Sequence, residues 1–292
     1  MKVAAVVLTH NYTAGVTAVL EDLVNQTRKP DEIIVIDNAS TDKTEQVVRE
    51  TFPQVHYVKL ESNTGCAGGF YEGLRVGVEY GDFIWTLDDD VKLYHDTLSN
   101  LLEGLTQVAH LGAIGAVRCV IKRKGGHLFK KMNGFAWRGT LINAESVKKI
   151  GLPIKEYFLY GCDAEYSLRL LKAGYSMFYI QDSYMQFSRD ERDSHRLFGI
   201  QTDYYFEPHR LYYGFRNEID LHIRYKEVIK MLRLIGYVIK VVICLLLWGR
   251  GQRWEKIKAV GNGVMDGLRS KLGKNDKYLP QSEILSRHEN CS

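Results

Sequence analysis

Phe83-Ile84-Trp85-Thr86-Leu87-Asp88-Asp89-Asp90 is the stretch that decides how this chain folds. Its first five residues favour β-structure and predict a buried strand. Unpaired charge inside a core is costly, so we expect the three aspartates where the strand emerges. Alternate residues of an extended segment point the same way, so Asp88 and Asp90 can converge while Asp89 turns aside. Two such carboxylates suit Mg²⁺ or Mn²⁺ shared with phosphate, and a solvated acidic turn is the alternative.

The chain before this strand alternates between short apolar strands and helical segments. The expected strands are 3–8, 32–36, 55–60 and 83–87, and the expected helices are 16–26, 44–51 and 70–80. This order predicts an α/β fold with a doubly wound, mostly parallel sheet. Ligands of such sheets bind at the carboxyl ends of the strands. Polar clusters follow those ends in this chain, which predicts a nucleotide site.

Three of these clusters precede the aspartates: Thr9-His10-Asn11, Asp37-Asn38-Ala39-Ser40-Thr41-Asp42 and Asn63-Thr64-Gly65-Cys66-Ala67-Gly68-Gly69. Asp37 lies where an acid commonly accepts hydrogen bonds from a ribose or base. A turn or N-cap acid is an equal interpretation. The glycines allow the backbone to approach a ligand, although the cluster is neither a GxGxxG fingerprint nor a P-loop.

Together the four motifs resemble those of family 2 glycosyltransferases. The resemblance implies the GT-A fold, a nucleotide-sugar donor that is UDP- or dTDP-linked, and inversion at the anomeric carbon. It also implies an Asp-x-Asp that holds Mg²⁺ or Mn²⁺ on the donor diphosphate, here Asp88 and Asp90. The donor-binding residues that it implies are Thr9, Asn11, Asp37, Asn38, Gly65, Gly68 and Asp88.

The segment from Gly161 to Arg169 resembles the acidic segment of bacterial galactofuranosyl- and rhamnosyltransferases. The resemblance implies that Asp163 is the general base, which an inverting displacement requires. A first-turn helix acid favoured by the helix dipole is compatible with that role. Glu165 is expected to contact the acceptor sugar, or to pair with Arg169 at i+4.

Three further positions carry expectations. The family pattern implies a histidine after the acidic segment, and His195 fits as a metal ligand, with a solvated loop histidine as the alternative. Trp137 is expected to stack on an acceptor sugar, with a core position as the alternative. Arg216 and Asn217 resemble a family signature that could clamp phosphate or cap a helix.

The composition is that of a globular protein, with 45% hydrophobic and 25% charged residues among 292. The apolar N-terminal run is short for a signal peptide and is expected to be the first strand. The five scattered cysteines contain no CxxC pair. This pattern argues against a disulfide framework or zinc site and favours a reducing compartment.

The charge is unevenly distributed. Residues 1–219 carry 25 Lys+Arg and 28 Asp+Glu, whereas residues 220–292 carry 14 and 7. We therefore expect a GT-A catalytic domain over 1–219 and a helical, basic, membrane-associating region over 220–292. A basic excess confined to the C-terminal region indicates a surface contact and argues against a nucleic-acid partner.

Residues 228–248 are strongly apolar, but their longest charge-free run is far shorter than the roughly 20 residues that span a bilayer. An apolar helix with a basic stripe is typical of attachment to an anionic membrane surface. We therefore expect a cytoplasmic protein, peripheral on the inner face of the cell membrane. A helix packed on the catalytic domain or in a dimer contact is the alternative. The expected stripe comprises Lys226, Lys230, Arg233 and Lys240.

The expected function is transfer of galactofuranose or rhamnose to a lipid-linked or polysaccharide acceptor in bacterial cell-surface glycan synthesis. Two alternatives stay open. A nucleotidyltransferase should carry a glycine- and Lys/Arg-rich loop after the first strand, and Thr9-His10-Asn11-Tyr12 lacks one. A catalytically inactive sugar-nucleotide-binding scaffold would bind a donor without turnover. A homo-oligomer and the role of Asp89 are also open.

Overall fold

The computed structural model describes residues 1–120, 128–187, 196–197, 200–201, 207–248 and 251–280. The chain divides into two compact units. Unit 1 comprises Met1–Lys155 with Asp163–Asp190, and unit 2 comprises Glu156–Cys162 with Glu191–Ser292. The expected boundary between residues 219 and 220 is wrong, because it falls inside one continuous helix, α7 (Pro208–Arg224), that buries residues on both sides of it.

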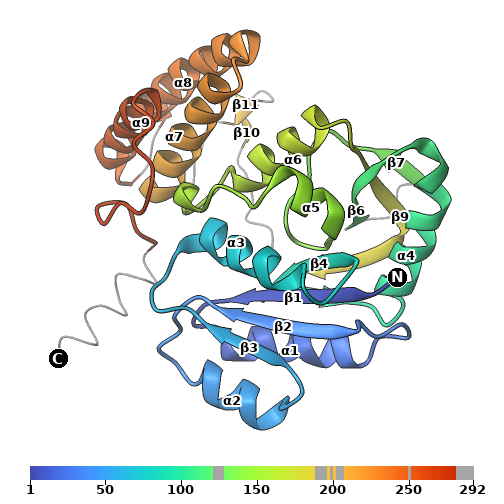
Figure 1. Cartoon of the computed structure of the whole chain (residues 1–292). Helices are drawn as coiled ribbons and strands as arrows, with labels where there is room; N and C mark the ends of the chain where they lie inside the picture. The colour runs from blue at the N-terminus through green and yellow to red at the C-terminus, as the bar shows by residue number, and fades with distance from the viewer. Residues whose placement is uncertain (121–127, 188–195, 198–199, 202–206, 249–250, 281–292) are drawn as a thin grey trace. The chain divides into compact units, whose positions relative to one another are not determined.

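Unit 1 is built on a sheet of nine strands among the described residues, in the order β3-β2-β1-β4-β8-β6-β9-β5, with β7 paired to β9 (Figure 1). Neighbours in the β3-β2-β1-β4 half are parallel, as predicted. In the other half β6 and β9 are parallel, while β8, β5 and β7 pair antiparallel. The strands are β1 (Val3–Thr9), β2 (Glu32–Asp37), β3 (His56–Lys59), β4 (Phe83–Asp88), β5 (Val91–Leu93), β6 (Ile114–Val120), β7 (Phe129–Lys131), β8 (Thr140–Asn143) and β9 (Ser176–Phe187).

Helices cover both faces of the parallel half, with α1 on one face and α3 on the other (Figure 1). Every residue of β1 is buried for this reason, which explains why its sequence is apolar up to the final Thr9. A Cβ on Gly69 or Gly73 of α3 would overlap a β1 side chain, so α3 packs close to the sheet. The helices of unit 1 are α1 (Thr13–Val24), α2 (Thr44–Thr51), α3 (Gly65–Gly77), α4 (Thr97–Val108), α5 (Ala144–Ile150) and α6 (Cys162–Lys172), with a 3₁₀ turn at Ala109–Leu111. The first residue of α6 and most of a second 3₁₀ turn, Lys155–Tyr157, are counted with unit 2.

The strand order reverses at β1, because β2 and β3 lie to one side of it and β4 lies to the other. A crevice at the carboxyl ends of the strands forms where the order of a doubly wound sheet reverses. Thr9 ends β1 and Asp88 ends β4. The fold therefore places the strand-end motifs at the position where such sheets bind ligands.

Unit 2 is a helical cluster formed by α7, α8 (Val228–Trp248) and α9 (Arg253–Leu268), with a short antiparallel pair of strands, β10 (Arg196–Leu197) and β11 (Ile200–Gln201). The three helices share one hydrophobic core, to which Phe158, Tyr278 and Leu279 also contribute. Of the helices in the described ranges, α8 alone has the length and apolar composition of a membrane-crossing helix, with a mean hydropathy of 2.1.

Candidate active site

The acidic triplet begins at the end of β4 and continues into the turn before β5, with Asp88 as the last residue of β4. Asp89 turns towards the loop after β1. Its Oδ2 accepts hydrogen bonds from Thr9 Oγ1 at 2.8 Å and from the backbone N–H of His10 at 3.3 Å. Asp89 therefore fixes this loop against the acidic turn, which is the role that the sequence left open.

Asp88 is surrounded by other charged groups. Burial raises the pKa of Asp88 to about 7, with the negative charge of Asp90 as the next largest cause. Asp89 and Asp163 act in the same direction, and Arg138 opposes them. The side chain keeps 32% of its surface exposed, so a ligand can reach it. These four carboxylates share one electrostatic environment that favours added positive charge.

Arg138 belongs to this site although no sequence motif indicated it. Its Nε lies 3.5 Å from Asp88 Oδ2, and its guanidinium lies over the ring of Phe187 at 4.3 Å from the centroid. The antiparallel pairing of β4 with β8 matches Thr86 with Thr140. Asp88 follows Thr86 by two residues and Arg138 precedes Thr140 by two, so the same register brings Asp88 and Arg138 together. Only this pairing of distant segments brings Arg138 to the acidic turn.

Arg118 supports the segment that carries Arg138. Its buried Nε donates hydrogen bonds to the carbonyl oxygens of Ala136 and Arg138 at 3.2 and 3.0 Å. A guanidinium stays charged even when buried, so Arg118 is a permanent cation in this part of unit 1. Arg118 and Arg138 are the two cations that the structure adds to the expected acidic residues.

A divalent cation fits the acidic turn. Asp90 Oδ1 is buried and has no hydrogen-bond partner among the described residues. Buried polar atoms are normally paired, so an orphaned carboxylate oxygen suits an ion that needs oxygen ligands. No three His, Cys, Asp or Glu side chains in the described ranges are grouped to surround an ion. Further ligands would have to come from the donor diphosphate, from water or from His195, which lies outside the described residues.

Asp163 lies in the first turn of α6. Its Oδ1 accepts a hydrogen bond from the backbone N–H of Ala164 at 2.8 Å. Burial raises the pKa of Asp163, while backbone hydrogen bonds and the charges of Arg118 and Arg138 oppose the rise. A carboxylate with a raised pKa accepts a proton more readily than an ordinary one, which suits a general base.

Glu165 does not have the acceptor-binding role that was expected. It is fully buried, and its Oε1 lies 2.7 Å from the Nε of Arg169. Arg169 also donates to Oε2 of Glu165 at 3.1 Å and to the carbonyl oxygens of Ile150 and Leu152. The acceptor prediction is wrong in this arrangement because the carboxylate is inaccessible. The alternative, a pair with Arg169 at i+4, is confirmed.

Trp137 is a core residue, so the prediction of stacking on an acceptor sugar is also wrong in this arrangement. Its ring stacks on Phe70 with centroids 5.0 Å apart, and Phe135 and Tyr166 pack edge-on or tilted against it at 5.4 Å. Only 4% of Trp137 is exposed. Burial of this large apolar surface within an aromatic cluster stabilises unit 1.

Replacing Trp137 with alanine is expected to lower the free energy of unfolding by about 3–5 kcal/mol, because it leaves a cavity in the cluster. Urea unfolding followed by circular dichroism measures the change. Trp254→Ala is the matched control, since Trp254 is 65% exposed and its loss should change stability by less than about 0.5 kcal/mol. A loss below about 1 kcal/mol for Trp137→Ala would contradict the core assignment.

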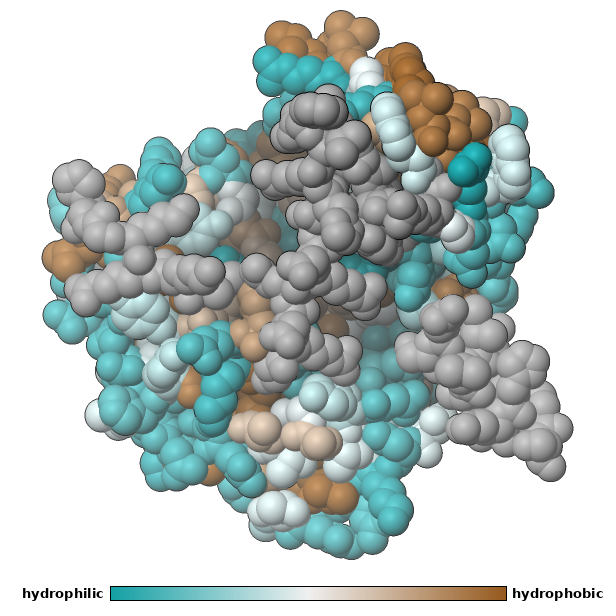
Figure 2. All heavy atoms as spheres, turned by 180° about the vertical axis from the view of Figure 1, so that it is seen from behind, coloured by the Kyte–Doolittle hydropathy of each residue, from teal (hydrophilic) through white to brown (hydrophobic). Residues whose placement is uncertain are grey.

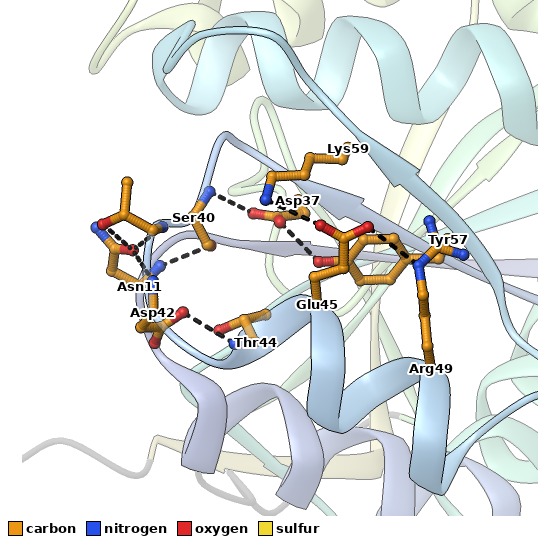
Figure 3. Close-up of polar contacts among 10 residues, drawn as sticks. Asn11, Asp37, Ser40, Asp42, Thr44, Glu45, Arg49, Tyr57 and Lys59 are labelled. Atoms are coloured by element: carbon orange, nitrogen blue, oxygen red, sulfur yellow. Dashed lines mark hydrogen bonds and ion pairs between the residues drawn. The ribbon is translucent and has the colours of Figure 1, made fainter.

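Asp37 ends β2 and is completely buried. Its Oδ1 accepts a hydrogen bond from the backbone N–H of Ser40 at 2.8 Å, and its Oδ2 accepts one from the hydroxyl of Tyr57 at 2.6 Å (Figure 3). The turn role is therefore confirmed. Each carboxylate oxygen has a second lone pair, so the contact of Asp37 with a nucleoside stays a prediction.

Asn11 connects the loops after β1 and β2 (Figure 3). It adopts a φ of 50°, which asparagine tolerates better than most residues. Its Oδ1 accepts a hydrogen bond from the backbone N–H of Thr41 at 2.7 Å, and its own N–H donates to Ser40 Oγ at 2.9 Å. Together with the bond from Thr9 to Asp89, these contacts order the strand-end loops. Donor contacts by Thr9 and Asn11 stay predictions.

Asn38 joins the end of β2 to the start of α3. Its Nδ2 donates to the carbonyl oxygen of Gly65 at 3.1 Å, and its Oδ1 accepts from the backbone N–H of Thr64 at 2.9 Å. Gly65 has a φ of 69°, which favours glycine, and a Cβ on Gly68 would overlap Thr64. The glycine cluster thus begins a helix, and donor contacts by these residues stay predictions.

Arg216 and Asn217 lie in the middle of α7 and are buried in unit 2. They neither clamp phosphate nor cap the helix, because their side chains donate to backbone carbonyl oxygens of the segment 156–162. Binding of the segment 156–162 thus takes the place of both expected roles, phosphate binding and helix capping.

Comparison with known proteins identifies the class. Residues 4–162, more than half of the chain, match the model of glycosyl transferase family 2. The chain therefore belongs to this family.

Galactofuranosyltransferase GlfT1 of Mycolicibacterium smegmatis is 27% identical to the chain, and the match covers 59% of the chain and 66% of that protein. The chain thus spans slightly less than two thirds of the length of this relative. Mannosyltransferase PcManGT from Pyrobaculum calidifontis, solved with GDP-Man and Mn²⁺, gives a TM-score of 0.59 at 17% identity, covering 99% of the chain and 80% of that protein. S. aureus TarS 1–349, solved with UDP, gives 0.56 at 17% identity and 92% coverage of each. These likenesses confirm the GT-A fold.

Proposed function

We propose that the chain is an inverting glycosyltransferase that moves galactofuranose from UDP-galactofuranose, with dTDP-rhamnose as the second candidate donor. The acceptor is a lipid-linked saccharide or polysaccharide of a bacterial cell surface. The shared electrostatic environment of Asp88, Asp90 and Asp163 carries the proposal. It places two carboxylates that can bind a cation, Asp88 and Asp90, in the same site as a carboxylate that can act as a base, Asp163. Membership of family 2 and the similarity to a galactofuranosyltransferase support the reaction and the donor.

Asp88 and Asp90 would hold Mg²⁺ or Mn²⁺ against the donor diphosphate. A bound divalent cation neutralises charge that develops on the leaving group. Arg138, 3.5 Å from Asp88, favours the ionised form of that carboxylate and so prepares it for binding. The orphaned Oδ1 of Asp90 supplies a second oxygen ligand.

Asp163 would take the proton of the acceptor hydroxyl as its oxygen attacks the anomeric carbon. The diphosphate leaves from the opposite side of the sugar, so the configuration inverts. One positioned base is sufficient for such a displacement. Glu165 is committed to Arg169 and has no part in the proton transfer.

A panel of nucleotide sugars tests the proposal. The full chain is incubated with UDP-galactofuranose, dTDP-rhamnose, UDP-GlcNAc or GDP-mannose, with Mn²⁺, Mg²⁺ or EDTA, and with an oligosaccharide acceptor. We expect metal-dependent release of a nucleoside diphosphate that is fastest with UDP-galactofuranose. Exchange of pyrophosphate into the donor would indicate a nucleotidyltransferase instead. Binding without turnover of any donor would indicate an inactive scaffold.

We also infer that unit 2 attaches the enzyme to the cytoplasmic face of the membrane through α8. One face of α8 packs into the core of unit 2 through Leu234, Val241, Cys244 and Leu245. The opposite face exposes a stripe of apolar side chains, and Figure 2 shows hydrophobic side chains gathered over unit 2. The α8 stripe comprises Val228, Leu232, Ile235, Ile239, Ile243 and Leu246.

Basic residues border the α8 stripe. Arg233 and Lys240 are exposed and lie seven residues apart, on one side of the helix. Lys226 has a φ of 56° and precedes α8, so the basic stripe is shorter than predicted. An exposed apolar stripe with basic residues beside it suits the interface of anionic lipid. Because the other face packs on helices of unit 2, we propose that α8 lies along the membrane instead of crossing it.

Replacing Leu232, Ile239 and Ile243 together with serine is expected to weaken binding to vesicles of phosphatidylglycerol and phosphatidylcholine at least about tenfold. Vesicle flotation of the full chain measures it. The matched control is Leu111→Ser with Leu128→Ser, since both leucines are exposed apolar residues of unit 1. The proposal would be overturned if the wild-type protein did not bind vesicles but formed a dimer that the triple substitution dissociates. The α8 stripe would then be a contact between two copies of the chain.

A further inference from the structure

The segment that leads into Asp163 has an uncommon backbone conformation. Phe158, Tyr160 and Gly161 have φ values of 60°, 60° and 79°. Residues with a side chain avoid this left-handed region, and two of them so close together persist only when the surrounding structure holds them. The segment 156–162 therefore needs contacts from elsewhere in unit 2.

Asn217 supplies the central contacts. Its Nδ2 lies 2.9, 2.8 and 2.7 Å from the carbonyl oxygens of Tyr157, Leu159 and Tyr160. An amide has two N–H donors, so three inward-turned carbonyls share the hydrogen bonds of one side chain. Asn217 is completely buried, and water cannot replace it. Its loss would leave these carbonyl oxygens without this donor.

Arg216 sets the orientation of the Asn217 amide. Its Nε donates a hydrogen bond to Asn217 Oδ1 at 2.8 Å, which leaves the amide N–H groups facing the segment. The guanidinium also donates to the carbonyl oxygens of Gly273 at 2.6 Å and Tyr157 at 2.9 Å. Arg216 is 1% exposed, so its donors are committed to these contacts.

Two further contacts complete the arrangement. The hydroxyl of Tyr157 donates to Asp220 Oδ2 at 2.9 Å. A Cβ on Gly161 would lie 3.3 Å from Asn217 Cβ, so the backbone approaches the helix closely at this glycine. We call Arg216, Asn217 and Asp220 the α7 clamp. All three come from two successive turns of one helix and act on the same segment.

We propose that Asn217 is a positioning residue for sugar transfer: through the α7 clamp it sets the backbone of the segment 156–162 and hence the direction of the Asp163 carboxylate. Cys162 ends the clamped segment and begins α6, so no flexible linker separates the clamp from Asp163. A base works only within hydrogen-bond reach of its proton, and a misplacement of about 1 Å can cost about 100-fold in rate. The inference rests on the proposed role of Asp163 as the base.

Asn217→Ala is expected to lower kcat about 10- to 100-fold, while the donor KM changes less than about twofold. The donor motifs belong to unit 1, so a defect confined to the base should spare donor binding. Tyr278→Phe is the matched control. It removes the hydrogen bond that the Tyr278 hydroxyl accepts from Asn262 in unit 2, which involves neither the α7 clamp nor the segment 156–162, and it should keep the wild-type kcat.

Amide hydrogen exchange of residues 156–163 tests the clamp independently of activity. We expect faster exchange there in Asn217→Ala and unchanged exchange in Tyr278→Phe. If Asn217→Ala fails to fold, Gly161→Ala is the second variant, because its added Cβ would press on Asn217 and displace the segment 156–162 from α7. It too should lower kcat with little change in the donor KM. Unchanged exchange would overturn the clamp, and fast exchange with a wild-type kcat would overturn the positioning role. A fully active Asp163→Asn variant would overturn the proposed base and the positioning role with it. Amide hydrogen exchange would still show whether the α7 clamp holds the segment 156–162.

Discussion

Replacing Asp163 with asparagine is expected to lower kcat about 10²- to 10⁴-fold, with a donor KM within about twofold of the wild-type value. The amide keeps an oxygen that can accept the hydrogen bond from Ala164, so the start of α6 should survive the substitution. It cannot take a proton from the acceptor. Steady-state kinetics with the preferred donor and a saturating acceptor measure the effect.

Glu145→Gln is the matched control for this substitution. Glu145 is an exposed acid in the first turn of α5, as Asp163 is in the first turn of α6. A helix-dipole contribution alone would make the two substitutions equivalent, at a cost of about 0.3–1 kcal/mol of stability. Wild-type kcat in Glu145→Gln and a large loss in Asp163→Asn would separate catalysis from helix stabilisation. Full activity in Asp163→Asn would remove the base assignment.

The pH dependence of kcat follows from the same group. Burial raises the pKa of Asp163 above its ordinary value of 3.8. The basic form is present above the raised pKa and is lost as the pH falls through it. The acid limb of the rate profile should therefore begin at a higher pH than an exposed aspartate would give, and it should be absent from the residual activity of Asp163→Asn.

Asp88→Asn is expected to lower turnover about 10²- to 10³-fold and, at the same time, to raise the melting temperature of the metal-free protein. Burial and the charge of Asp90 raise the pKa of Asp88 from 3.8 to about 7. Ionisation of Asp88 therefore lowers the free energy of unfolding progressively as the pH rises from 3.8 to about 7, and the loss is complete above about pH 7. A neutral amide of the same shape removes this cost.

Thermal melts at pH 8 with EDTA, with Mn²⁺, and with Mn²⁺ and UDP measure both effects. Mn²⁺ should stabilise the wild-type protein and leave Asp88→Asn unchanged, because a ligand stabilises only the state that binds it. Asp96→Asn is the control, since 46% of the Asp96 side chain is exposed and it makes no cap bond at the start of α4. A Mn²⁺ response in Asp88→Asn equal to that of the wild type would contradict the metal assignment.

The strand-end motifs could be predicted because two local signals coincide in them. Apolar runs such as Phe83–Asp88 identify strands, and the polar residues that follow them must lie at one edge of a parallel sheet. Arg138 could not be predicted in this way. It reaches Asp88 only through the antiparallel pairing of β4 with β8, and a single sequence does not show which strands pair.

Trp137 and Glu165 show a second limit. Residue type suggested a sugar contact for both, but burial decides what a side chain can touch, and both side chains are buried. The domain boundary was misplaced for a related reason. The change in charge near residue 220 is real, yet Asp220 is bound to Tyr157, so the helical unit includes a segment from the middle of the chain.

The anomeric configuration of the transferred sugar tests the central claim most directly. The full chain is incubated with UDP-galactofuranose, Mn²⁺ and an oligosaccharide acceptor, and the product is analysed by NMR before it can be modified further. A single general base at Asp163 predicts that every new linkage has the configuration opposite to that of the donor. A product that keeps the donor configuration would contradict the account.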